Sequence, residues 1–367
     1  ILNMYFKKNY FDNIKIFLIL FFPLSLLFGP AILNLYVVLL IISSLLIYKF
    51  EPFLKYKYFV VSSMILSFYL IFVASFKFID LDSFIKSLLF LRFPLLAILT
   101  SFLFYKYKVL EKHLKILILI FIFIFCDSLI QFFFQKNIFL QQPLTTGGVY
   151  RITSVFGKES ILGSYILKLT YPVLVIYSLK FKQSNFLLLF IFILSLFLII
   201  ISGERIILLK FLLFNFILLI FLKKYQFLFI ILTLSFVIII SFFYSSEYFN
   251  NRIVSFYEAI INFVKTPYFP LFEKAMLIFK DNIFFGVGFK NFRHVCNYDE
   301  YSLILSYLIN AGCSTHPHNY IMEILSETGI IGFFLFFNIF LYVIFKSFYN
   351  HNRIDYLAFF VLFLTLL

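Results

Sequence analysis

The sequence predicts an all-α, polytopic membrane protein, and three features of the chain support this fold class. Hydrophobic residues make up 63% of the chain and charged residues only 13%, whereas a soluble domain carries about 25% charged residues. Apolar runs of about 18 or more residues recur, and each is long enough to cross a ~30 Å hydrocarbon layer as a helix. These runs are uninterrupted, whereas the strands of a membrane barrel alternate over about 10 residues. We therefore expect helices, which satisfy their own backbone groups in lipid.

The apolar runs predict about 11 to 12 transmembrane helices. The expected spans are 15–29, 31–48, 58–76, 84–105, 114–134, 160–179, 185–201, 206–222, 226–244 and 318–345, and a further span begins near residue 355. No small-residue cleavage site follows the first run, so we expect a retained span rather than a signal peptide. The chain begins at Ile1 without Met and ends at Leu367 inside an apolar run, so we expect a piece of a longer protein.

Lysine and arginine in the short loops predict the orientation of the spans. Basic residues precede the first span and follow the second, fourth, sixth, eighth and tenth. The N-terminus and these loops are therefore expected in the cytoplasm, and two long loops on the opposite face. The predicted regions are N-terminal transmembrane helices (1–134), an outer loop (135–159), transmembrane helices (160–244), a large outer loop (245–317) and C-terminal transmembrane helices (318–367, truncated).

Two classes of partner are not indicated, although the formal net charge is +14. The cations lie in short clusters between spans rather than on one face, so we expect no nucleic-acid partner. The stretch "FFGVGFKNF" (284–292) resembles a nucleotide-binding loop only by its two glycines, and we interpret it as a turn. We therefore expect no nucleotide and no other cofactor.

The stretch "CSTHPHNYIMEILSETGIIG" (313–332) places titratable residues at the entrance of an apolar run. Ser314 or Thr315 is expected to cap a helix, with Pro317 in its first turn. The free N–H groups and the dipole of a helix N-terminus favour an anion and disfavour a protonated imidazole. His318 could therefore stay neutral and serve as a base near pH 7.

A polar stripe continues from this entrance into the apolar run, at Asn319, Glu323 and Glu327. Ionisable groups within a membrane are expensive and mark functional sites, so we favour a site over the alternative of two interfacial histidines. His316 and His318 are separated by one proline and do not share a helix face, and no third ligand has recognisable spacing. We therefore expect no metal.

Three arginines of the predicted outer loops are candidates for binding an anion. They are Arg205 in "IISGERIILL", Arg252 in "NNRIVSF" and Arg151 in "GGVYRITSVFGKESILGSYI". The planar guanidinium matches a phosphate or diphosphate with two hydrogen bonds. The alternatives are a hairpin turn with a Glu204–Arg205 pair and a solvated charge at Arg252. The glycines around Arg151 predict a re-entrant or tightly turned segment.

The three cysteines fall in two kinds of environment. Cys126 lies in the middle of a predicted span, where we expect a small core residue. Cys296 and Cys313 both fall in the large outer loop, where an oxidising compartment would let them pair. The spacing by itself does not establish that disulfide.

A motif late in the chain resembles the signature of the O-antigen ligase and O-antigen polymerase superfamily. His318 and Asn319 are followed by nine residues and then by Gly329-x-x-Gly332, which matches the pattern His, Asn/Ser/Gln, nine residues, Gly-x-x-Gly. Further stretches look like the same superfamily, namely "SGER" (202–205), "FFGVGFKNF" (284–292) and "YRITSVFGKESILGSY" (150–165).

The resemblance implies a metal-independent glycan transferase with a helical fold similar to the lipid-dependent glycosyltransferases. It would lie in the bacterial inner membrane with its active site facing the periplasm. The donor would be a glycan on undecaprenyl diphosphate. The acceptor would be the lipid A core for a ligase or another lipid-linked glycan for a polymerase, and the residues leave this choice open.

The resemblance also implies roles for single residues. His318 maps to the essential histidine, and Arg205 and Arg252 map to arginines that engage the pyrophosphate. Arg151, His316 and Asn319 are further expected substrate-binding residues, and Gly329 and Gly332 are expected to be structural. A transporter of the lipid-linked glycan is a weaker alternative, because transporters place polar sites near the midplane, often in repeated halves. A purely structural membrane partner would not need a histidine at a helix entrance.

Overall fold

The computed structural model describes most of the chain between residues 16 and 349. The described residues are 16–18, 20–107, 110–146, 149–180, 185–221, 225–245, 254, 257–258, 261–266, 268–302 and 313–349. These residues form two compact units. Unit 1 takes its described residues from 1–43 and 100–256, and unit 2 takes them from 44–99 and 257–350.

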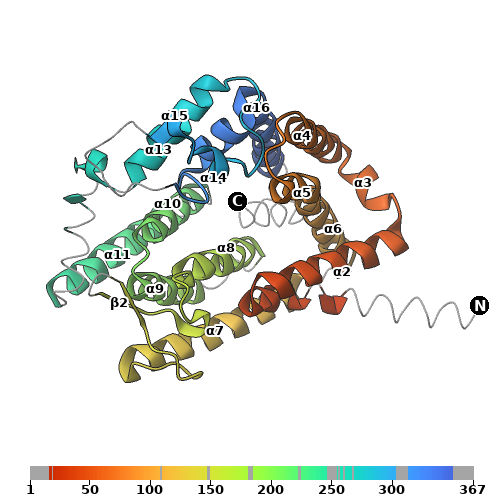
Figure 1. The fold of residues 1–367 in the computed structure, drawn as a ribbon. Helices are drawn as coiled ribbons and strands as arrows, with labels where there is room; N and C mark the ends of the chain where they lie inside the picture. Colours follow the sequence, from red (N-terminus) through yellow and green to blue (C-terminus); the bar gives the residue numbers. More distant parts are fainter. Residues whose placement is uncertain are drawn as a thin grey trace, which may run out of the picture. The chain divides into compact units, whose positions relative to one another are not determined.

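Unit 1 consists of helices and one short β-hairpin. Its elements are η1 (Leu26–Phe28), the first part of α2 (Pro30–Tyr48), the last part of α6 (Arg92–Tyr107), α7 (Leu110–Phe134), β1 (Leu144–Thr146), β2 (Val149–Arg151), η2 (Ser154–Phe156), α8 (Leu162–Lys180), α9 (Asn185–Ser202), α10 (Arg205–Phe221) and α11 (Tyr225–Ser245). Within this unit α8 packs against α7, α9 and α10 (Figure 1). The hairpin lies in the predicted outer loop 135–159, where the sequence predicts a tight turn.

Unit 2 is also helical. Its elements are the last part of α2, α3 (Glu51–Lys55), α4 (Lys57–Phe76), α5 (Leu81–Leu89), the first part of α6, η3 (Phe263–Lys265), α13 (Tyr268–Asp281), α14 (Phe292–Val295), α15 (Asp299–Ser302) and α16 (Tyr320–Tyr349). The long helix α16 packs against α4 and α13.

The helices confirm that this is a multi-pass helical membrane protein. Segments long and apolar enough to cross a membrane are Ala31–Tyr48, Lys57–Phe76, Leu81–Tyr107, Glu111–Phe134 and Tyr320–Val343, and Phe186–Ser202 and Phe229–Ser241 are shorter apolar helices. Each coincides with a predicted span to within a few residues, and α8 and α10 occupy the predicted spans 160–179 and 206–222. The total of about 11 to 12 spans stays a prediction, because residues 1–15 and the span expected near 355 lie outside the described residues.

The span predicted as one helix over 84–105 is broken. α5 ends at Leu89 and α6 begins at Arg92. Pro94 has no N–H group to donate to the carbonyl of Phe90, four residues earlier. The N–H of Phe93 donates to that carbonyl instead, at 3.0 Å. The proline therefore divides the apolar run into two helices.

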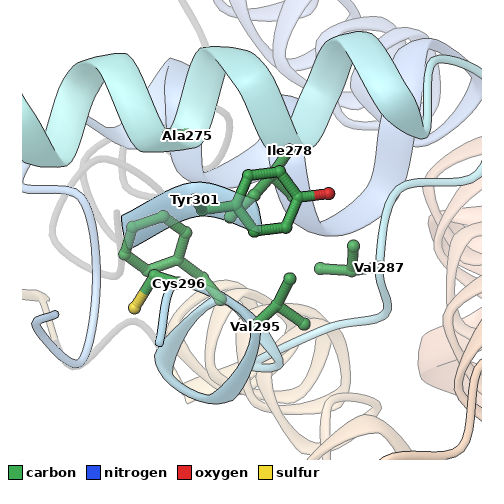
Figure 2. Close-up of a cluster of buried hydrophobic side chains, with 7 residues drawn as sticks. Ala275, Ile278, Val287, Val295, Cys296 and Tyr301 are labelled. Carbon is green, nitrogen blue, oxygen red and sulfur yellow. The ribbon is translucent and has the colours of Figure 1, made fainter. Parts of the chain in front are cut away.

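A buried cluster joins α13 to the chain that follows it in unit 2. Ala275 and Ile278 of α13 pack with Val287, Val295 and Tyr301 (Figure 2). The Tyr301 hydroxyl donates a 3.0 Å hydrogen bond to a carboxylate oxygen of Asp281, at the end of α13. Burial, and then this carboxylate, raises the pKa of Tyr301 to about 12. The cluster fixes the loop after α13 on the helix.

The helix predicted over 318–345 is kinked, which the sequence did not predict. Gly329 has φ 65° and ψ −172°, in the middle of α16. This backbone conformation is open essentially only to glycine. A kink of this kind leaves carbonyl and N–H groups of the helix without partners from the helix itself.

The segment 282–288 supplies those partners through four backbone hydrogen bonds. They run from Val287 N to Ser326 O (3.0 Å), from Gly288 N to Glu327 O (2.8 Å), from Ile330 N to Ile283 O (2.8 Å) and from Ile331 N to Phe284 O (3.4 Å). The Tyr69 hydroxyl of α4 donates to the carbonyl of Thr328 at 2.6 Å. An unsatisfied backbone group at membrane depth costs several kcal/mol, so this segment makes the kink tolerable.

Alanine at position 329 tests this docking. A Cβ there would lie 2.3 Å from the carbonyl oxygen of Phe284, whereas at Gly29, which has φ 90°, nothing lies within 4 Å of it. We expect Gly29→Ala to lower the stability of the folded protein by about 1–3 kcal/mol, through backbone strain alone. Gly329→Ala should lower it more, because the added methyl group also pushes the docked segment away. The measurement is the temperature at which the detergent-solubilised protein aggregates. If the two variants lower the aggregation temperature equally, the docked segment can move to make room for the methyl group.

Candidate functional site

The start of α16 is set by Asn319. Its side-chain oxygen accepts hydrogen bonds from the N–H groups two and three residues later, both at 3.1 Å. The prediction that Ser314 or Thr315 caps this helix, with Pro317 in its first turn, is wrong, because all three precede the helix. His318 has φ 54°, a left-handed conformation that stops the helix from extending backward. Asparagine is among the strongest N-caps.

His318 lies immediately before this cap, with its side chain exposed. Its ring centroid is 4.3 Å from that of His316 and 5.4 Å from that of Tyr268, the first residue of α13. Nδ1 of His316 and the hydroxyl of Thr315 are 2.9 Å apart. The structure therefore brings the two predicted histidines together and adds an aromatic neighbour from α13. Within the described part of the chain, no three His, Cys, Asp or Glu side chains gather as metal ligands.

The surroundings of His318 favour its neutral form. Burial of part of the ring lowers the pKa of His318, the neighbouring His316 lowers it further, and Glu323 acts in the opposite direction. A histidine whose pKa lies below its ordinary value is neutral at pH 7, and one ring nitrogen can then accept a proton. The sequence interpretation attributes this state to the helix dipole, whereas the causes of the lowered pKa in the structure are burial and His316.

The polar stripe of α16 anchors the segment after α13. The Lys290 ammonium forms an ion pair with Glu323, and its backbone N–H donates to Glu327 Oε2 at 2.8 Å. Glu327 is buried, with 1% of its surface exposed. Lys290 itself has φ 63°. These two acids therefore hold the chain just after the docked segment, which gives the stripe a structural role that the sequence interpretation did not predict.

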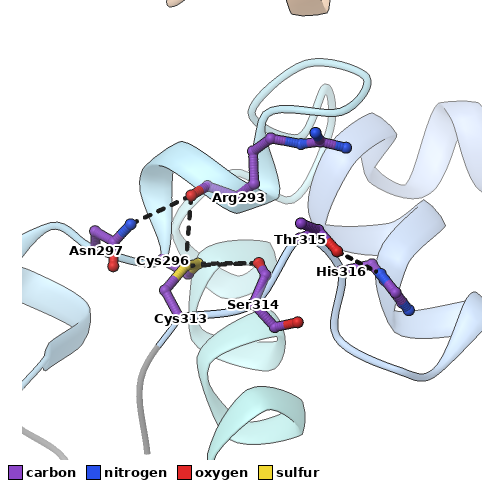
Figure 3. Close-up of a disulfide and its surroundings, with 7 residues drawn as sticks. All are labelled: Arg293, Cys296, Asn297, Cys313, Ser314, Thr315 and His316. Atoms are coloured by element: carbon purple, nitrogen blue, oxygen red, sulfur yellow. Dashed lines mark hydrogen bonds between the residues drawn. A yellow bond between two sulfur atoms is a disulfide. The ribbon is translucent and has the colours of Figure 1, made fainter. Parts of the chain in front are cut away.

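A disulfide joins Cys296 and Cys313 (Figure 3). Their Cα atoms are 5.6 Å apart, within the range that a disulfide spans. The bond connects the end of α14 to the chain just before His316. The approach to His318 is therefore tied both to α14 and, through the ring of Tyr268, to α13. Cys126 differs from expectation, because its side chain is exposed on α7.

In unit 1, Glu204 of the "SGER" stretch caps a neighbouring helix rather than pairing within its own turn. Its carboxylate accepts hydrogen bonds from the N–H groups of Gly163 (2.6 Å) and Ser164 (3.2 Å) and from the Ser164 hydroxyl (2.7 Å). These residues open α8, where an anion is favoured by the helix dipole. A Cβ at position 163 would lie 2.7 Å from the Ser202 hydroxyl, so the close contact requires glycine.

Two of the predicted arginines lie at this capped turn. Arg205 begins α10, directly after Glu204. Arg151 ends β2, and its charge acts on Glu204, whose pKa is raised by burial and lowered again by its hydrogen bonds and by Arg151. The adjacent Ile152 N–H donates to the carbonyl of Ile201 at 3.3 Å. Unit 1 thus brings Arg151 and the start of α10 together, whereas Arg252 lies outside the described residues.

A buried polar network, which the sequence analysis missed, holds the outer loop on α7. Asp127 accepts from the Ser154 hydroxyl at 2.5 Å and from the Ile138 N–H at 2.8 Å. Gln131 accepts from the N–H groups of Thr153 (2.8 Å) and Ser154 (2.7 Å). Two polar residues four apart in an apolar run lie on one helix face, and this spacing could have identified the network. It holds the loop just before β1 and just after Arg151.

The comparisons with known proteins agree with the motif. Residues 190–337 match the family Wzy_C, described as O-Antigen ligase. A search of curated protein sequences found no match. Members of the matched family are glycan-transferring ligases and polymerases that use lipid-linked glycans. An O-antigen ligase domain is therefore present in this multi-pass membrane protein, from α9 to the part of α16 beyond the kink.

Proposed function

We propose that this protein is an O-antigen ligase that transfers a glycan from undecaprenyl diphosphate to the lipid A core at the periplasmic face of the bacterial inner membrane. The observation that carries the proposal is His318, exposed at the start of α16 with a lowered pKa, in a chain with an O-antigen ligase domain. A neutral, accessible imidazole is the group needed to activate a hydroxyl near neutral pH.

The proposed step is a displacement at the anomeric carbon of the donor sugar. His318 accepts the proton of the acceptor hydroxyl while the oxygen of that hydroxyl forms a bond to the anomeric carbon. The bond from the carbon to the diphosphate oxygen breaks, and the carrier leaves as undecaprenyl diphosphate. His318 then releases its proton to solvent. Because the attack comes from the side opposite the leaving group, the configuration at the anomeric carbon is inverted.

The remaining predicted residues bind the two substrates in this proposal. Arg205, Arg252 and Arg151 stabilise the negative charge that grows on the diphosphate as it leaves. His316 and Asn319 contact substrate beside His318. The cap uses only the side-chain oxygen of Asn319, which leaves its NH₂ group as a donor. A repeat-unit polymerase would use the same donor chemistry with a lipid-linked glycan as acceptor.

Removal of the imidazole tests its role. We expect His318→Ala to reduce transfer from a purified lipid-linked donor by about a hundredfold or more, since general-base catalysis contributes about 10²–10⁴-fold. His294→Ala is the matched control, because His294 lies in the same unit with its Nε2 3.8 Å from Asp80 and has no role in the proposed step. Transfer that survives in His318→Ala would contradict the assignment.

The pH dependence of transfer gives a second test, because two substitutions should shift the pKa of His318 in opposite directions. A base works only when it is deprotonated, so activity falls as the pH drops through the pKa of His318. His316→Ala removes a charge that lowers this pKa, so the acidic limb of kcat/KM should move to higher pH. Glu323→Gln removes a charge that raises the pKa, so the limb should move to lower pH. Shifts in the same direction would exclude His318 as the titrating group.

A further inference from the structure

Helices α8 and α10 of unit 1 lie parallel, with their N-termini together. At that end, the Glu204 carboxylate accepts a hydrogen bond from the N–H of Gly163 at 2.6 Å. Further along, the Tyr171 hydroxyl donates to the carbonyl of Lys210 at 3.2 Å, and the Tyr171 ring stacks on Phe214 with centroids 3.6 Å apart. Contacts that advance along both helices in the same direction require a parallel pair.

The first half of each of these helices carries one lysine among mostly apolar residues, and the two lysines lie on neighbouring helices. Lys168 precedes Tyr171 by three residues, so both lie on the face of α8 that meets α10. Both lysine side chains are exposed, and Lys168 lies one turn before Tyr171, whose hydroxyl contacts the carbonyl of Lys210. Among the described residues, no carboxylate forms an ion pair with either lysine. Two like charges in apolar surroundings are unfavourable unless an anion joins them.

The geometry of the helices directs both ammonium groups toward the same end. Lys168 lies about 9 Å along α8 from Leu162, and Lys210 lies about 7.5 Å along α10 from Arg205, at 1.5 Å per residue. Side chains on a helix lean toward its N-terminus. Both lysines therefore reach toward the end that holds Arg205 and Arg151, where the helix dipoles are also positive.

The surroundings fit a lipid rather than a free anion. Glu204, the carboxylate at this end of the pair, is already engaged by three hydrogen bonds from Gly163 and Ser164. Leu209 and Leu213, which flank Lys210 on α10, are exposed apolar residues and would contact hydrocarbon chains. A lipid with its anionic head group between the two lysines and its hydrocarbon chain along α10 would fit both the lysine charges and the exposed leucines.

We propose that Lys168 and Lys210 together bind the phosphate group of a membrane lipid. Two sources share this chemistry: a polyprenyl diphosphate and an anionic glycerophospholipid. In the first case the lysines extend the diphosphate site below Arg205, and that identification rests on the proposed function. In the second case they hold a structural lipid beside the α8–α10 pair.

The test measures lipid binding without turnover. The purified full chain is placed in nanodiscs of phosphatidylcholine that contain a small fraction of either undecaprenyl diphosphate or phosphatidylglycerol, and retained lipid is quantified by native mass spectrometry. We expect Lys168→Gln/Lys210→Gln to weaken retention of one of these lipids by about tenfold or more, because both charges that attract an anionic head group are lost. Lys168→Arg/Lys210→Arg should retain binding, because the charges remain.

Lys57→Gln, an exposed lysine at the start of α4, is the matched control and should bind both lipids as the parent does. If the double variant retains less undecaprenyl diphosphate but as much phosphatidylglycerol as the parent, the ligand of the two lysines is a polyprenyl diphosphate. If it retains less phosphatidylglycerol only, the ligand is a glycerophospholipid. Unchanged retention of both lipids, in a double variant that elutes as a single species, overturns the proposal. His318→Ala should bind normally in this assay, so failure of the catalytic proposal is distinguishable from failure of the lysine site.

Discussion

The backbone of α16 breaks at Gly329, and within a membrane this break is tolerable only because the segment 282–288 fills it. Carbonyl groups before the kink and N–H groups after it have no partner within the helix, and hydrocarbon offers none. The docked segment pairs with both sets. Glycine is required at the kink both for its backbone conformation and for the space that the Phe284 carbonyl occupies.

The candidate active site depends on this docking through α13. The docked segment directly follows α13, and α13 packs along α16. Lys290, two residues after this segment, forms an ion pair with Glu323 and donates its backbone N–H to Glu327. The other end of α13 begins at Tyr268, whose ring contacts His318. A kink in the membrane helix therefore fixes the element that packs against the proposed base, and the disulfide provides a second attachment just before the two histidines.

Composition and apolar run length were sufficient to predict the helical membrane fold, because a bilayer imposes both constraints directly. The same signals did not reveal the break before Arg92 or the kink at Gly329, since both depend on single residues and their tertiary partners. The motif identified the neighbourhood of His318, but its cap is Asn319, and two acids of the polar stripe proved to anchor Lys290. Hydrophobic periodicity carries no information about such contacts.

The proposed function rests on the transfer of a lipid-linked glycan to the lipid A core. The most direct measurement is complementation by the full-length protein of a bacterial strain that lacks its O-antigen ligase but makes the matching lipid-linked glycan, followed by a lipopolysaccharide gel. We expect the ladder of glycan-bearing lipopolysaccharide to return. If the protein reaches the inner membrane of that strain and no ladder is restored, the protein is not an O-antigen ligase for this glycan.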